Sequence, residues 1–140
     1  MSGITNLKMV GLDSNVFIYH FEANPEFVKK TELILNKLLK NNLKAVTSVI
    51  SITEALSYPS PQSVIDAITE GFNTIPNLII YEVSREIAIE AARIRREYKI
   101  RLPDAIQLSS ALVSKAQAFI TNDDHLKSFK EIKILALSKI

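Results

Sequence analysis

Hydrophobic residues alternate along the chain between short apolar runs and longer stretches with helical spacing. The short runs predict five strands, at residues 8–13, 43–47, 77–83, 118–122 and 132–137. The intervening stretches predict helices at 14–21, 25–41, 48–58, 62–72, 84–98 and 103–112, and a short helical connection at 123–129. Strands that alternate with helices indicate an α/β fold with a parallel sheet and helices on both faces.

Composition is consistent with one domain spanning 1–140. The 140 residues include only three glycines and five prolines, and no stretch has the composition of a linker or repeat. The absence of cysteine excludes disulfides and thiolate metal sites. No apolar run is long enough to cross a membrane and no signal peptide is recognisable, so we expect a cytoplasmic protein with no membrane partner.

The formal net charge of +2 is too small to identify a partner, whereas the positions of the acidic residues are informative. Asp13 and Asp123 each end a predicted strand, Asp104 opens a predicted helix, and Glu54 lies in the helix after the second strand. Ligands of open parallel sheets bind at the carboxyl ends of the strands. We therefore expect these four carboxylates to meet at one edge of the sheet.

Each acid also has a purely structural explanation. Asp13 can cap the helix that follows it, and Asp104 suits the positive end of a helix dipole. Asp123 can belong to a polar turn, and Glu54 can be an ordinary surface residue. Only their combined order along the chain favours a shared site.

Glu54 shares a polar stripe of its predicted helix with Thr47 and Ser51. No Lys or Arg lies three or four residues away to pair with it. The core-facing stripe expected for this helix consists of Val49, Ile52 and Leu56.

Four clustered carboxylates repel one another unless a cation neutralises them. An all-oxygen ligand set favours Mg²⁺ or Mn²⁺ over zinc. His20 and His125 are expected to be structural or solvent-exposed, and no histidine pair is available for metal-free ribonuclease chemistry.

Four motifs occur in an order that resembles the PIN-domain nucleases, and most closely the VapC-type toxins of type II toxin–antitoxin pairs. They are LDSNVFI at 12–18, TEAL at 53–56, LPDAIQLSSA at 102–111 and FITND at 119–123. The resemblance covers residues 9–137. It leaves no room for the extra domains of larger members, and it leaves Asp124 outside the motifs as a peripheral acid.

The resemblance implies a single PIN-like domain with strand order 3-2-1-4-5, in which the strands ending at Asp13 and Asp123 are neighbours. It implies that Asp13, Glu54, Asp104 and Asp123 are the catalytic, metal-binding residues, supported by Asn15 and Thr121. It further implies an Mg²⁺-dependent (or Mn²⁺-dependent) endoribonuclease that leaves 5′-phosphate and 3′-hydroxyl ends. The implied partners are an RNA substrate, a small antitoxin and a second copy of the chain in a homodimer.

Basic residues concentrate at 93–101, just before Asp104. They either form a solvated helix face paired with Glu90 and Glu97, or line a path for phosphates into the site. The candidate RNA-binding residues are Arg93, Arg96, Arg101 and Lys127. An apolar stripe at 64–72 suits either an antitoxin interface or, as we expect, ordinary core.

Other functions remain to be distinguished. The chain could be a standalone PIN nuclease of RNA processing, or a PIN-like module that binds RNA or protein without catalysis. Phosphotransferases of the haloacid-dehalogenase type need a second Asp two residues after the first, where this chain has Asn15. A phosphoacceptor receiver domain needs adjacent acids after the first strand, where Leu12 and Ser14 flank Asp13.

Overall fold

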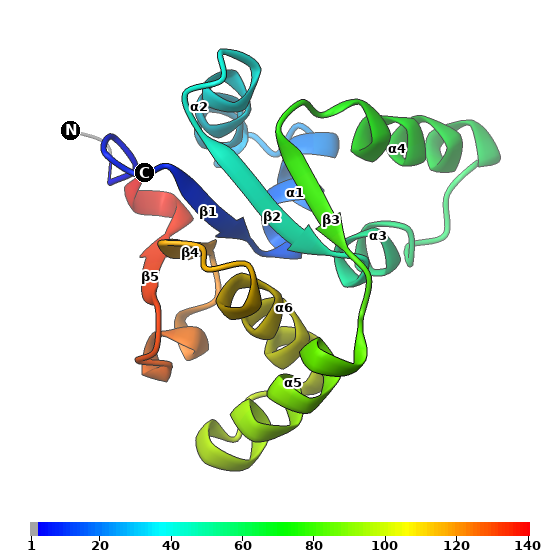
Figure 1. Cartoon of the computed structure of the whole chain (residues 1–140). Coiled ribbons are helices and arrows are strands. Elements are labelled where there is room, and N and C mark those ends of the chain that lie inside the picture. The colour runs from blue at the N-terminus through cyan, green and yellow to red at the C-terminus, as the bar shows by residue number, and fades with distance from the viewer. Residues whose placement is uncertain (1–2) are drawn as a thin grey trace.

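A computed structural model describes residues 3–140 and contains five strands, six α-helices and two short 3₁₀ helices (Figure 1). The strands are β1 (Met9–Leu12), β2 (Lys44–Ser48), β3 (Leu78–Tyr81), β4 (Ala118–Thr121) and β5 (Lys133–Ala136). The helices are α1 (Ser14–Phe21), α2 (Val28–Leu39), α3 (Ile50–Ala55), α4 (Gln62–Thr74), α5 (Arg85–Tyr98) and α6 (Leu102–Val113), with η1 (Asp124–Ser128) and η2 (Leu137–Lys139). Within the described residues, none of the helices has the length and apolar character needed to cross a membrane.

The five strands form one parallel sheet in the order β3-β2-β1-β4-β5. This arrangement confirms the predicted α/β class and strand order. Leu12 of β1 pairs with Ile120 of β4, so Asp13 and Thr121 emerge side by side at the carboxyl edge. The centre of the sheet thus brings together segments more than 100 residues apart.

Two separate cores cover the two faces of the sheet (Figure 1). Val10 and Leu12 of β1 belong to the core formed with α1, α2 and α4. Phe119 of β4 belongs to the core formed with α5 and α6. Because successive side chains of a strand point to opposite faces, this alternation explains the uninterrupted apolar runs of the central strands.

Gly11, on β1, allows α6 to lie directly against the sheet. A β-carbon at this position would come within 2.8 Å of the Phe119 ring and 2.9 Å of the Ala111 β-carbon. These separations are too short for any side chain, so glycine permits the close packing of β1 and α6. The same packing holds the N-terminal end of α6, and therefore Asp104, near the edge of β1.

Two sequence-based predictions about helices were wrong in detail. The helix predicted at 48–58 is only six residues long, and its buried residue is Ser51, whereas the predicted core residues Val49, Ile52 and Leu56 are only partly buried. The stripe at 64–72 is not simply core: Phe72 is buried, but Val64 is exposed and Ile65 and Ile68 are partly buried. Ile52 and Ile68 still pack against the core that contains Phe72, so the predicted apolar contacts form only in part.

Candidate active site

Asp13 is a buried carboxylate at the junction of β1 and α1, with only 3% of the residue exposed. Its Oδ1 accepts a hydrogen bond from the Ser14 backbone N–H at 2.8 Å, which caps α1. Burial above all, together with the neighbouring carboxylates of Asp104 and Glu54, raises the pKa of Asp13 to about 6, against the lowering effect of its hydrogen bonds. Asp13 caps α1, but its carboxylate is also unfavourably buried. The capping role alone therefore does not account for an aspartate at this position.

Thr121 links Asp13 to Asp123. Its hydroxyl donates to Asp13 Oδ2 at 2.6 Å and accepts from the Asp123 backbone N–H at 3.0 Å. One side chain thereby fixes the carboxylate after β1 and the backbone after β4. This is the position in which the sequence predicted a supporting residue.

Asn15 lies against the same carboxylate. Its Nδ2 is 3.5 Å from both Asp13 Oδ2 and Thr121 Oγ1, at the outer limit of hydrogen bonding. Its Oδ1 is buried and has no hydrogen-bond partner among the described residues. Buried polar atoms normally have a hydrogen-bond partner, so this amide oxygen beside a carboxylate is a candidate metal ligand.

Asp104 and Asp123 line a cleft of about 570 Å³ together with Arg101 and His125. Burial raises the pKa of Asp104, and the charge of Asp123 raises it as well, while Arg101 at 3.3 Å from Oδ2 acts in the opposite direction. His125 was predicted to be structural or exposed; its ring is exposed, yet Nδ1 lies 3.0 Å from Asp123 Oδ1. The only signal for this contact along the chain is that the two residues are two positions apart.

Glu54 is partly buried and faces the site from α3. The Ser14 hydroxyl donates to Glu54 Oε1 at 2.9 Å, and the Ser14 backbone N–H donates to Asp13 Oδ1. Ser14 therefore contacts two of the four acids. Together with the electrostatic effect on Asp13, this contact places the Glu54 carboxylate near Asp13. Ser14 was not singled out from the sequence, although it directly follows Asp13.

The four predicted acids therefore lie at one edge of the sheet, where Asp104 and Glu54 help to raise the pKa of Asp13 and Asp123 helps to raise the pKa of Asp104. Within residues 3–140, no three acidic or histidine side chains are gathered closely enough to hold a metal ion as they stand. The donor set nonetheless fits a hard divalent cation, because every candidate ligand is an oxygen and Asn15 Oδ1 and the buried Asp13 carboxylate both lack a positive partner. His20, by comparison, contacts Thr31 and is separate from these acids.

The candidate RNA-binding residues fall into two groups. Arg93 is held by Glu90, Glu97 and Glu131, and its hydrogen bonds to Glu131 and Glu90 raise its pKa. Arg96 is exposed and forms no ion pair with a described residue, and Arg101 and Lys127 are exposed with one carboxylate each. Arg93 thus joins α5 to the loop before β5, and the other three remain available to an anion.

A family model described as the PIN domain matches residues 10–132, which is most of the chain. The protein belongs to the PIN-domain family. The match includes all four motifs and all four acids. A search of curated proteins finds no match.

Solved structures with the same fold extend this result. A chain of the VapBC2 complex from Rickettsia felis bound to promoter DNA aligns with a TM-score of 0.73 at 19% identity, covering 91% of this chain and 98% of that chain. A chain of a toxin–antitoxin complex from Klebsiella pneumoniae aligns with a TM-score of 0.71 at 22% identity, covering 94% and 99%. DNA-bound VapBC from Salmonella typhimurium gives 0.66 at 23% identity, covering 94% and 98%. At these identities the likeness is one of fold.

Proposed function

We propose that this PIN-domain protein is a Mg²⁺-dependent (or Mn²⁺-dependent) endoribonuclease. The observation that carries the proposal is the convergence of Asp13, Glu54, Asp104 and Asp123 from four separate segments, with Asp13 buried and without a cationic partner. Burying a carboxylate among other carboxylates is unfavourable unless a cation compensates. Four neighbouring carboxylates, one of them buried, do not help to stabilise the fold, so their arrangement favours a functional role.

The four carboxylates would hold the cation, with Asn15 and Thr121 orienting Asp13. A bound divalent ion supplies an acidified water and charge compensation for the leaving oxygen. Asp13 and Asp104 are the most buried of the acids and would be the principal ligands. Arg101, at the rim of the cleft, would contact the phosphate that enters beside Asp104.

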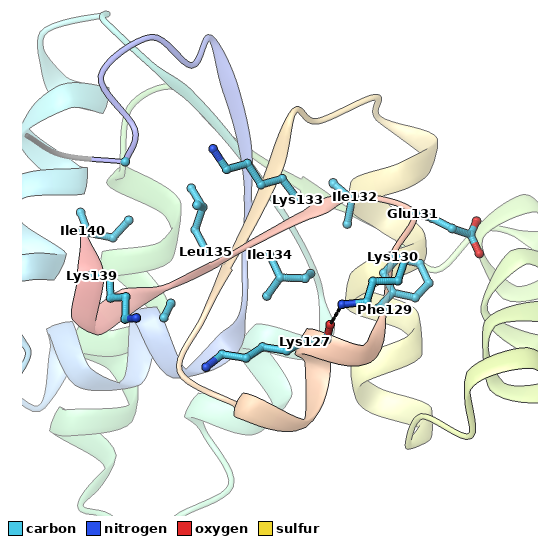
Figure 2. Close-up of a pocket in the computed structure, with 12 residues that line it drawn as sticks. Lys127, Phe129, Lys130, Glu131, Ile132, Lys133, Ile134, Leu135, Lys139 and Ile140 are labelled. Carbon is cyan, nitrogen blue, oxygen red and sulfur yellow. Dashed lines mark hydrogen bonds between the residues drawn. The ribbon is translucent and has the colours of Figure 1, made fainter.

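The proposed RNA path leads from Arg96 and Arg101 across the cleft to Lys127. Lys127 borders a groove of about 690 Å³ along β5, which is also lined by Lys130, Lys133 and Lys139. Figure 2 shows the side chains of Lys127 and Lys139 extending toward the carboxyl end of β5, the same edge of the sheet as the acids. Backbone phosphates of a single strand would be bound along this row of amines.

We further propose that the nuclease is the toxin of a type II toxin–antitoxin pair, with an antitoxin as partner. Support comes from the similar structures, which are VapBC and other toxin–antitoxin complexes. A small groove between α1, α3 and α4, lined in part by Phe21, Tyr58 and Val64, offers an apolar surface for that partner. The resemblance to VapC-type toxins also implies a homodimer, which sedimentation of the purified protein measures.

The experiment is cleavage of total RNA by purified protein, with Mg²⁺ or with EDTA. We expect cleavage in Mg²⁺, no cleavage in EDTA, and no cleavage by Asp13→Asn or Asp104→Asn variants that retain the wild-type circular dichroism spectrum. Equal cleavage in EDTA, or full activity in either variant, would contradict the proposal. Inhibition by the product of a neighbouring small gene would separate the toxin from a standalone processing enzyme.

A further inference from the structure

Helix α6 is buried along most of its length, although several of its residues are polar. Every residue from Asp104 to Ala111 is buried, so each polar side chain needs an internal partner. Ser109 donates to the Ile87 carbonyl of α5 at 2.7 Å, and Ser110 donates to the Ile106 carbonyl of its own helix at 2.9 Å. Gln107 instead points toward the ends of β1 and β2.

The amide of Gln107 has one possible orientation. Its Oε1 accepts from the Ser48 backbone N–H at 3.2 Å, and because a backbone N–H can only donate, this oxygen is fixed. Its Nε2 must then face Ser51, to whose Oγ it donates at 2.8 Å. The Ser48 hydroxyl also donates to Oε1, at 3.1 Å.

The same reasoning gives a direction to every hydroxyl in this network. Thr47 donates to the Leu12 carbonyl at 2.8 Å, and a carbonyl can only accept. Ser51, 2.7 Å from the Thr47 hydroxyl, must therefore donate to Thr47. The donors therefore run in one direction from Gln107 through Ser51 and Thr47 to Leu12, and all four residues are buried. The Thr47 hydroxyl also lies 3.3 Å from Gln107 Oε1, a longer contact with a second acceptor.

This chain joins the segments that carry three of the four acids. Gln107 lies one helical turn after Asp104 in α6, and Ser51 lies one turn before Glu54 in α3. Residues three apart share a face of a helix, so the network forms a layer adjacent to the carboxylates. Its terminal acceptor is Leu12, whose carbonyl belongs to the peptide unit that leads into Asp13.

Helix α3 is six residues long, and Ser51 is its fully buried residue. Its partly buried Ile52 and Ala55 pack against the core beside α1, and the Ile50 backbone N–H donates to the Ser48 hydroxyl at 3.2 Å. Isolated helices of this length are unstable, so its position depends on tertiary contacts. The donation from Gln107 to Ser51 connects it to α6 across 56 positions of sequence.

We propose that Gln107 is a positioning residue, which sets the separation of the carboxylates of Asp13, Glu54 and Asp104 through the chain Gln107–Ser51–Thr47–Leu12. This inference rests on the proposed metal site and adds a determinant of its affinity. Loss of the amide would leave the fold in place and allow α3 to move relative to α6. Residues that orient metal ligands typically contribute ten-fold or more to metal affinity.

The test is the dissociation constant for Mn²⁺ alone, measured by electron paramagnetic resonance at a temperature far below unfolding. The variant is Gln107→Met, which preserves side-chain length without hydrogen bonds. The matched control is Ser109→Ala, on the same helix, equally buried, and bonded to α5 rather than toward the site. We expect Gln107→Met to weaken Mn²⁺ binding at least ten-fold, and Ser109→Ala to leave it within two-fold even if both lower the melting temperature.

A second pair of variants covers the case in which Gln107→Met does not fold. Thr47→Val removes the hydroxyl that reaches Leu12 and keeps the shape, whereas Thr47→Ser keeps the hydroxyl. We expect the valine variant to weaken Mn²⁺ binding and the serine variant to restore it. Wild-type affinity in Gln107→Met or in Thr47→Val would overturn the inference, while failure of the wild-type protein to bind Mn²⁺ would overturn the proposed function as well.

Discussion

Asp13 and Glu54 both contribute carboxylates to the proposed cation site, and the protein holds them in different ways. Asp13 is fixed by the Thr121 hydroxyl at 2.6 Å and the Ser14 backbone N–H at 2.8 Å, on a central strand of the sheet. Glu54 receives one hydrogen bond, from the Ser14 hydroxyl at 2.9 Å, and stands on a six-residue helix. From this difference we infer a rigid side of the site, at β1 and β4, and an adjustable side, at α3.

The comparison suggests a division of roles. The ionised form of a rigidly held, buried carboxylate is unfavourable until a cation binds. A carboxylate held by fewer contacts can adjust its position to the ion and the substrate. The cost of the rigid side is visible in the raised pKa of Asp13. The position of Glu54 on the adjustable side depends, in turn, on the hydrogen-bond network that begins at Gln107.

Charge removal on the two sides should give the largest difference. Asp13→Asn should lower Mg²⁺-dependent cleavage by about a thousand-fold or more, because the most buried ligand is lost. Glu54→Gln should lower it less, by about a hundred-fold, because α3 can adjust. Single-turnover cleavage of a defined RNA measures both, and a larger loss in Glu54→Gln would reverse the proposed division.

Stability without metal should show the cost of the rigid side. The folded protein keeps a proton on Asp13 up to about pH 6, whereas the unfolded chain releases it near pH 4. The free energy of unfolding in EDTA should therefore fall as the pH rises from 4 to 7, by about 2 kcal/mol from this group.

Asp13→Asn removes this titration, so its stability should change less over the same pH range and exceed that of the wild-type protein at pH 7. Urea denaturation at pH 4.5 and pH 7 measures the difference. Wild-type stability that rises over this window in parallel with the variant would contradict the effect.

The hydrogen bonds on the two sides should differ in importance. Thr121→Val removes the donor to Asp13 and the acceptor for the Asp123 backbone, so it should weaken Mn²⁺ binding about ten-fold or more. Ser14→Ala removes only the hydroxyl bond to Glu54 and leaves the backbone cap of α1 intact. Its effect on Mn²⁺ binding should be about three-fold, corresponding to a partly exposed hydrogen bond.

The smallest expected effect concerns two arginines three residues apart on α5. Arg96→Ala should reduce the salt dependence of RNA binding by about one phosphate contact. Arg93→Ala should leave the salt dependence unchanged, because Arg93 is occupied by three glutamates. Filter binding to a single-stranded RNA at several salt concentrations, with the inactive Asp13→Asn protein, distinguishes the two; equal slopes for both variants would exclude this assignment.

The α/β class and the positions of the acids at strand and helix ends could be predicted from local patterns, whereas the strand order was predicted only through the resemblance to PIN-domain nucleases. Apolar runs ending on Asp13 and Asp123 place two acids at one edge, and Ser84 caps α5 as its sequence indicates. The buried network could not be predicted. Thr47, Ser51 and Glu54 formed a polar stripe that suggested a surface, and only the partner Gln107, far along the chain, makes that stripe internal.

Arg93 shows the same limit. Its pairing with Glu90 and Glu97 follows from helical spacing, but Glu131, 38 residues away, required the fold. Spacing alone also could not show that Ser51 is the fully buried residue of α3, while Ile52 packs against the core only in part.

The central claim is that four carboxylates from separate segments form one divalent-cation site. The most direct measurement is Mn²⁺ binding to the wild-type protein and to Asp104→Asn, followed by electron paramagnetic resonance without RNA. The account predicts saturable binding by the wild-type protein, displaced by excess Mg²⁺, and binding weakened at least ten-fold in Asp104→Asn. Equal binding by the two proteins, or no saturable binding by either, would contradict it.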